Sequence, residues 1–173
     1  MAHKLSLNRI FLIPFIIFAS TTYAQKSVSF ADSTAICKKV SNEYFEAYFN
    51  LDFDSMLNIM HDSISFQDPT ARFVFGGKKI DGKDKVYENF KQSYASILEM
   101  KQDPIRTIFS SNTGIYEINL TWKFKNSPEK IISIEMPLIV ILTVENGKVI
   151  EHRDYGDYHY FIDQYNHQLS QGN

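Results

Sequence analysis

The sequence predicts an α+β fold, in which a curved antiparallel or mixed sheet wraps around a pocket and three N-terminal helices close it. First, apolar residues recur every three or four positions between residues 33 and 98, as on the buried face of a helix. Second, long segments that alternate apolar and polar residues follow between residues 105 and 158. Third, turns rich in Asn, Gly and Pro separate these segments, at residues 112–114, 126–128 and 146–147. Helices followed by antiparallel strands are typical of the α+β class.

The first 24 residues have the features of a secretory signal peptide. A basic start precedes an apolar core, and small residues stand before the expected cleavage site at Gln25. We therefore expect the protein to be exported, to the periplasm or out of the cell, with an uncleaved membrane anchor as the alternative. The three parts of this leader are Lys4 with Arg9, residues 10–19, and Thr22 with Ala24.

The remaining length suits a single domain at residues 33–165, between a loose lead-in at residues 25–32 and a polar tail at residues 166–173. The chain has a formal net charge of −2, and loss of the two basic residues of the leader brings it near −4. This acidic balance argues against a nucleic-acid partner, and after cleavage no membrane association is expected. Cys37 is the single cysteine, so it cannot form an internal disulfide and is expected to be buried.

The three predicted helices begin at short polar residues or glycine, as helices commonly do. They run from Asp32 or Ser33 to about Asn50, from Phe53 (after Asp52) to about Met60, and from Asp81-Gly82 to about Leu98. Each has an apolar stripe at spacings of three and four residues, which is expected to face the core. The stripes are Cys37, Val40, Tyr44 and Tyr48; Phe53, Met56, Leu57 and Met60; and Val86, Phe90, Tyr94 and Ile97.

A short strand is predicted at residues 64–68, and Pro69 ends it because proline has no N–H for a strand ladder. The loop at residues 70–80 contains Phe73, Phe75 and two glycines. It either covers the mouth of a pocket or is a plain hairpin. The long strands are predicted at residues 105–110, 115–125, 130–144 and 148–158.

Strand alternation predicts which side chains face the pocket, because successive residues point to opposite faces of a sheet. On the last strand His152 and Asp154 share one face, whereas Arg153 and Asp157 belong to the other. A pocket lined by these faces is mostly apolar and has a few polar groups. This composition is typical of a site for an apolar small molecule. The expected apolar lining is Ile118, Leu120, Trp122, Met136, Leu138 and Val140, with Phe75 from the loop.

Several short motifs accompany this order of elements. They are Phe66-Gln-Asp-Pro69, Gly82-Lys-Asp-Lys-Val86, Glu135-Met-Pro137, Asn146-Gly-Lys-Val149 and Arg153-Asp-Tyr-Gly-Asp157. The combination resembles the nuclear transport factor 2-like superfamily over about residues 33–162, in particular its SnoaL-like polyketide cyclases, limonene-epoxide hydrolases and ketosteroid isomerases. The resemblance implies a cone-shaped sheet around a deep pocket and a homodimer formed through the outer face of the sheet.

The resemblance to the ketosteroid isomerases implies two site residues. Their Glu-Asp-Pro stretch holds a general-base aspartate and is matched by Gln67-Asp68-Pro69, which implies that Asp68 is a base. Their oxyanion-binding tyrosine falls on Tyr44 by ungapped counting. Their second oxyanion donor falls near Val140, so this chain departs from the isomerase pattern there.

The resemblance to the epoxide hydrolases implies a third site residue. Their Trp-Arg-Asp-Tyr-Phe-Asp stretch supplies a catalytic aspartate, and His152-Arg-Asp-Tyr-Gly-Asp157 is similar to it, which implies a role for Asp154. The arginine and second aspartate of their triad fall near Ile118 and Leu120, and their water-holding asparagine falls near Asp68. The chain therefore does not preserve that triad.

Two carboxylates in one apolar cavity suit general acid–base chemistry, because burial and mutual repulsion raise a carboxyl pKa towards neutrality. Each candidate also has a structural interpretation. Asp68 can cap the turn before Pro69, and Asp154 can form a buried ion pair with an arginine or lysine. Tyr44 can belong to the core, and His152 can be a hydrogen-bonded structural histidine.

Neither a metal nor a cofactor is expected. The cluster His152, Asp154, Asp157 and His159 is divided two and two between the faces of the sheet, which is unsuitable for a metal site. The chain has no glycine-rich phosphate loop, nucleophile elbow or CxxC motif.

The sequence leaves three functions open. The first is an enzyme that isomerises, cyclises or hydrolyses an apolar small molecule by proton transfer. The second is a non-catalytic module that binds such a molecule, and the third is a module for dimerisation or assembly. The sequence favours binding of a small molecule and leaves catalysis undecided.

Overall fold

The computed structural model describes residues 28–77 and 79–171. The predicted signal peptide lies outside these residues. None of the described helices combines the length and apolar character needed to cross a membrane.

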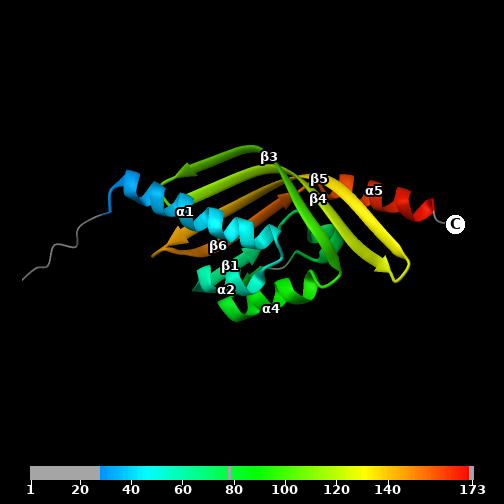
Figure 1. Cartoon of the computed structure of the whole chain (residues 1–173), viewed down its shortest axis with the longest axis horizontal. Coiled ribbons are helices and arrows are strands. Elements are labelled where there is room, and N and C mark those ends of the chain that lie inside the picture. The colour runs from blue at the N-terminus through cyan, green and yellow to red at the C-terminus, as the bar shows by residue number, and fades with distance from the viewer. Residues whose placement is uncertain (1–27, 78, 172–173) are drawn as a thin grey trace, which may run out of the picture.

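The fold is built on one six-stranded sheet with the strand order β2-β1-β6-β5-β4-β3. Strands β1 and β6 are parallel, and the other neighbours are antiparallel, so the sheet is mixed. It is strongly curved and is not closed into a barrel (Figure 1). The strands are β1 (Met60–Gln67), β2 (Ile80–Asp81), β3 (Ile97–Ser110), β4 (Thr113–Ser127), β5 (Lys130–Glu145) and β6 (Lys148–Gly156).

Helices pack against the concave side of the sheet and at its ends. The long helix α1 lies along the sheet, α2 and α4 lie next to each other, and α5 lies at the end away from the start of α1 (Figure 1). This arrangement confirms the predicted α+β fold with N-terminal helices. The helices are α1 (Phe30–Phe49), α2 (Phe53–Ile59), α3 (Arg72–Phe75), α4 (Lys83–Ser93) and α5 (Tyr158–Ser170).

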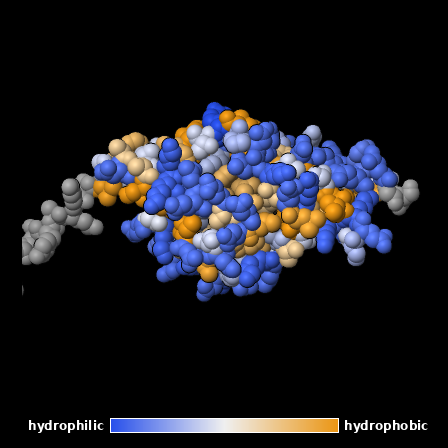
Figure 2. Space-filling model, in the orientation of Figure 1, coloured by the Kyte–Doolittle hydropathy of each residue, from blue (hydrophilic) through white to orange (hydrophobic). Residues whose placement is uncertain are grey.

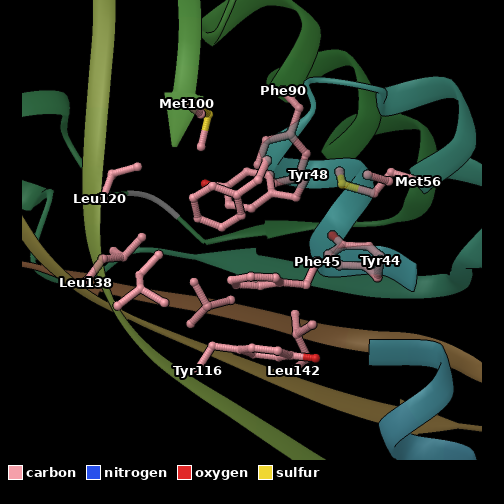
Figure 3. Close-up of a cluster of buried hydrophobic side chains, with 14 of the residues drawn as sticks. Tyr44, Phe45, Tyr48, Met56, Phe90, Met100, Tyr116, Leu120, Leu138 and Leu142 are labelled. Carbon is pink, nitrogen blue, oxygen red and sulfur yellow. The ribbon is translucent and has the colours of Figure 1, made fainter. Parts of the chain in front are cut away.

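The core lies between α1, α2 and α4 and the inner face of the sheet. Along β4 and β5 every second side chain is buried, as the alternation predicts. Aromatic side chains of α1 and α4 meet leucines of β4 and β5 in this space (Figure 3). Phe45 of α1 stacks on Tyr116 of β4, with ring centroids 4.0 Å apart. Inner-face and helix side chains thus fill most of the concavity.

The third predicted helix is too long in the sequence analysis. Helix α4 ends at Ser93, with Tyr94 as its C-cap, and Ile97 pairs with Phe124 as the first residue of β3. Ile97 stands three residues after Tyr94, a spacing that also fits a helix. Its pairing with β4 nevertheless makes it part of a strand. Strand β3 is also longer than predicted, because its pairing with β4 continues past Pro104, which an edge strand can accommodate.

The C-terminal segment corrects a second prediction. From the sequence, the last strand is expected to extend to Tyr158 and residues 166–173 to form a polar tail, but β6 ends at Gly156 and α5 continues to Ser170. Asp157 caps α5, because its Oδ1 accepts a hydrogen bond from the Tyr160 N–H.

Helix α5 takes the place of a strand beside β5. Strand β6 ends opposite Leu138, so the earlier part of β5 is not paired with β6. The side-chain amides of Gln164 and Gln168 each make two hydrogen bonds to the backbone N–H and C=O of Glu135 and Ser133, respectively. Four helical residues rise about 6 Å and two strand residues about 6.7 Å, so the two spacings match. The amides therefore satisfy backbone groups at an edge that is otherwise open to pairing.

Candidate functional site

A buried histidine–aspartate pair lies on the inner face of β6. His152 is fully buried and Asp154 is 3% exposed. Their neighbour Arg153 instead bonds Glu151 on the outer face, as the alternation predicts. Asp157 lies beyond the strand, at the start of α5. The two candidates from the last strand therefore share the interior.

The geometry allows one consistent set of protons for the pair when Asp154 is ionised. His152 Nε2 lies 2.8 Å from Asp154 Oδ1, and His152 Nδ1 lies 3.2 Å from the Tyr44 hydroxyl oxygen. With Asp154 ionised, Nε2 donates to it, and in a neutral imidazole Nδ1 then accepts from Tyr44. The pair is thus oriented at both ends. Asp154 is paired with a histidine, not with the arginine or lysine considered in its structural interpretation.

Two tyrosines that the sequence analysis assigned only to the core complete this network. The Tyr48 hydroxyl donates to Asp154 Oδ2 over 3.0 Å, and its oxygen lies 2.6 Å from the Tyr94 hydroxyl oxygen. Because the Tyr48 proton is directed to Asp154, Tyr94 is the donor in the second bond. The hydrogen bonds therefore run from Tyr94 through Tyr48 to Asp154. Their joint position could not be inferred from helical spacing, because they belong to different elements.

Aromatic rings surround the imidazole of His152. The ring centroids of Tyr44, Tyr48, Phe66 and Phe90 lie 4.9 to 5.7 Å from that of His152. Three of these residues, from α1 and α4, are seen together in Figure 3. This setting has a low dielectric, which strengthens each hydrogen bond and makes an unpaired polar group costly.

Burial keeps the tyrosines of this network protonated. It raises the pKa of Tyr44, Tyr48 and Tyr94, and the nearby Asp154 carboxylate raises each of them further. All three therefore act as neutral hydroxyl groups at physiological pH. They can orient and transfer protons without carrying a negative charge.

Asp68 lies in a second polar cluster at the end of β1. Its Oδ1 accepts from the backbone N–H groups of Thr70 and Ala71 and from the Thr70 hydroxyl. Its Oδ2 accepts from the Tyr158 hydroxyl at 2.5 Å. Asp68 therefore caps the turn at Pro69, as in its structural interpretation, and also bonds a tyrosine of α5. Tyr158 was not among the predicted site residues.

The electrostatic environment of Asp68 links the two clusters. Burial raises the pKa of Asp68, and repulsion from Asp154 adds to the rise, while hydrogen bonds from Thr70 and Tyr158 oppose it. This is the direction expected for two carboxylates that share an apolar interior. Each carboxylate accepts a hydrogen bond from its own tyrosine: Tyr48 donates to Asp154, and Tyr158 donates to Asp68.

The six predicted lining residues on the strands are all buried on the inner face. Phe75 lies on α3 and is 61% exposed, and its ring makes edge-to-face contacts with Tyr158 and Phe161, so it lies at the surface and not among these buried residues. Gly76, in a left-handed conformation, is the C-cap that ends α3 directly after Phe75. The buried set is Ile118, Leu120, Trp122, Met136, Leu138 and Val140.

Two open hollows, each of about 580 Å³, lie along the start of α5. The more apolar one reaches Thr70, Leu138 and Tyr158. Thr70 and Tyr158 are hydrogen-bonded to Asp68, so they separate this groove from the buried carboxylate. Its lining also includes Glu117, Ile139 and Tyr155 of the outer face, and it does not include His152 or Asp154. Within residues 28–77 and 79–171, no three metal-ligating side chains come together.

Comparison with known proteins places the chain among similar folds. A family model described as the SnoaL-like domain matches residues 42–152. A protein of Shewanella denitrificans described as a SnoaL-like polyketide cyclase is 20% identical, with a TM-score of 0.68 over 76% of this chain and 97% of that one. An LEH-like epoxide hydrolase from M. tuberculosis is 13% identical, with a TM-score of 0.63 over 79% and 93% of the two chains.

A nuclear transport factor 2-like protein of Burkholderia pseudomallei is 19% identical, with a TM-score of 0.63 over 75% of this chain and 96% of that one. No curated protein matches the sequence of the chain. At these identities the structural likenesses concern the fold.

Proposed function

The chain belongs to the SnoaL-like domain family of the nuclear transport factor 2-like superfamily, and from this premise we propose that it binds an apolar small molecule and transfers protons to or from it. The reaction is of the isomerase, cyclase or hydrolase type and uses no cofactor. Asp154 is the central acid–base group, His152 and Tyr44 orient it, and Asp68 is a second carboxyl group.

The observation that carries this proposal is the buried His152–Asp154 pair with a complete set of hydrogen bonds. Removing two ionisable groups from water costs free energy, and apolar residues of similar size often give a core of equal or greater stability. Ionisable groups in such surroundings are concentrated at functional sites. Catalysis gives a physical reason for placing this pair among aromatic rings.

The chemistry follows from the positions of the protons. As a carboxylate, Asp154 accepts a proton from the substrate, either directly or through Tyr48. His152 then faces a neutral carboxylic acid, and Tyr44 keeps the imidazole in the same orientation. Asp68, with its raised pKa, is able to exchange a proton nearer to neutral pH than an exposed aspartate.

The apolar lining determines the kind of ligand. Six aliphatic or aromatic side chains of β4 and β5 face the interior, and burial of apolar surface is the main favourable contribution from such a wall. A ligand that is mostly hydrocarbon, with one or two polar atoms for the aspartate clusters, is complementary to it.

Native mass spectrometry tests the binding part of the proposal. Protein purified without denaturant is measured before and after extraction with organic solvent, and the empty protein is then incubated with apolar ketones and phenols. We expect a one-to-one complex with a neutral molecule, either co-purified or reformed. Absence of any complex in both conditions contradicts the proposal.

An assembly module is the alternative function, and exposed apolar side chains favour it. Apolar patches interrupt the mostly hydrophilic face in Figure 2. On the outer side of the sheet, Ile105 and Ile139 are 55% and 38% exposed, respectively. Light scattering after size exclusion should give a dimer that Ile139→Lys dissociates, with Lys125→Gln as a surface control. A monomer at all concentrations contradicts this alternative.

We also propose that the first 24 residues direct export. The support is the order of a basic start, an apolar core and small residues before Gln25. Mass spectrometry of the protein from cell fractions should give a mature chain that begins at Gln25, outside the cytoplasm. A full-length chain confined to the cytoplasm contradicts export.

A further inference from the structure

Trp122 has a buried hydrogen-bond donor without a partner. Its side chain is 9% exposed, and its indole Nε1 is the one buried side-chain nitrogen or oxygen that lacks a hydrogen bond within the described part of the chain. The indole N–H can only donate. An unsatisfied donor in the interior costs free energy and calls for an explanation. A ligand atom that accepts this hydrogen bond removes the cost.

Tyr94 supplies the complementary group next to it. The rings of Tyr94 and Trp122 are in edge contact, with centroids 6.1 Å apart and an interplanar angle of 88°. The Tyr94 proton is used in the bond to Tyr48, so its oxygen keeps a free lone pair that can accept. The two neighbours therefore offer one donor and one acceptor.

A hydroxyl group meets both requirements at once, because it donates one hydrogen bond and accepts others. We propose that Trp122 Nε1 and the Tyr94 hydroxyl bind the hydroxyl group of a neutral phenol or enol. This inference rests on the proposed function and names the chemical class of its ligand. The ligand hydroxyl donates to Tyr94 and accepts from Trp122.

The same contacts connect the ligand to Asp154. The ligand O–H bond breaks as its proton passes to the Tyr94 oxygen, while the Tyr94 proton passes to Tyr48 and the Tyr48 proton to Asp154. Both tyrosines remain neutral, Asp154 becomes a carboxylic acid, and the ligand becomes an oxyanion that accepts from Trp122 Nε1. The net change is the transfer of one proton from the ligand to Asp154.

The charges of the interior select a neutral and weakly acidic hydroxyl. Apart from tyrosines and Cys37, the buried ionisable side chains of the described residues are Asp68, Asp154 and His152, and none of them is a lysine or arginine. A ligand that arrives as an anion is therefore repelled by two carboxylates. A phenol or enol has an acidity near that of tyrosine, about pKa 10, so it can enter neutral and ionise more readily than an alcohol.

Met100 gives the site room to open. It pairs with Trp122 across β3 and β4, and its side chain is buried in the same cluster (Figure 3). Methionine has a flexible side chain that adapts to irregular spaces. Its rotation can change the shape of the space beside Trp122 without a change in the backbone.

The test uses the single tryptophan of the chain. In ¹H–¹⁵N spectra, Trp122 gives the one indole N–H signal, which is followed during addition of 2-naphthol or naphthalene. We expect 2-naphthol to bind at least tenfold more tightly than naphthalene by calorimetry and to move the indole proton downfield. Trp122→Phe and Tyr94→Phe should each lower the affinity for 2-naphthol about tenfold and change the affinity for naphthalene less than twofold. Tyr165→Phe, at an exposed hydrogen bond on α5, is the matched control.

Two results overturn the inference and are distinguishable from each other. Equal affinities for 2-naphthol and naphthalene, with an unmoved indole signal, refute the hydroxyl contact but leave binding of apolar molecules intact. The Trp122 N–H is then explained by weak contacts with the neighbouring rings of Tyr94 and Phe161. Absence of binding by both compounds contradicts the inference together with the proposed function.

Discussion

At the scale of single residues, Asp154 is defined by its partners. One carboxylate oxygen accepts from His152 and the other from Tyr48. Strand alternation in the sequence was sufficient to place His152 and Asp154 together on the inner face. It could not identify Tyr48, Tyr94 or Tyr158 as partners, because those contacts depend on how separate elements pack.

Tyr48→Phe tests the role of the hydroxyl in this cluster. The change leaves Asp154 Oδ2 without a donor and Tyr94 without its acceptor, so we expect a loss of about 1–3 kcal/mol in the free energy of unfolding. Urea denaturation measures this loss. Tyr87→Phe is the matched control, because its hydroxyl bonds Asp54 at an exposed position and its loss should cost about 0.5 kcal/mol or less. Equal losses in the two variants would show that the buried hydrogen bonds of Tyr48 contribute no more than an exposed one.

Asp68→Asn tests the pKa shift of Asp68. Because that pKa is raised, the folded protein holds the proton to a higher pH than the unfolded chain does. The resulting stability is complete below the unfolded pKa of about 4 and is lost as the pH rises through the folded pKa. The stability of Asp68→Asn relative to wild type should therefore increase over this window, measured by urea denaturation at a series of pH values. Parallel curves for the two proteins contradict the shift.

At the scale of elements, α5 is the main structure that the sequence analysis missed. Its start depends on the cap at Asp157, a residue interpreted from strand parity as part of the last strand. Its position depends on Gln164 and Gln168, whose four-residue spacing has meaning only beside an open strand edge. Local patterns predict an element well when its own residues stabilise it, and poorly when a neighbouring element does.

Replacing both Gln164 and Gln168 by Ala tests this edge contact. The change leaves the backbone groups of Ser133 and Glu135 without protein partners, so their amide hydrogens should exchange with solvent at least tenfold faster. Hydrogen–deuterium exchange followed by NMR measures these rates. Gln171→Ala is the control, because the Gln171 side chain lies at the C-terminal end of α5 and bonds only His167. Unchanged protection of Ser133 and Glu135 in the double variant contradicts the proposed pairing.

At the scale of the whole molecule, the order of helices and strands was enough to predict a curved sheet, antiparallel or mixed, and that order together with the short motifs indicated the superfamily. The predicted inner face of β4 and β5 is also correct, because burial imposes a strict alternation. The extent of open space inside the cone could not be predicted, since it depends on how side chains such as Phe45 and Phe90 fill it. The site is consequently a compact polar network with a groove beside it.

The proton-transfer claim is tested most directly with an apolar ketone whose α-protons are acidic, such as 2-tetralone. Its exchange with deuterium in D₂O is followed by ¹H NMR. We expect wild-type protein to accelerate the exchange and Asp154→Asn to lose at least about 100-fold of that acceleration. Glu151→Gln, on the outer face of the same strand, should retain it. Exchange no faster than in buffer, or equal rates for wild type and Asp154→Asn, would show that Asp154 is not an acid–base centre.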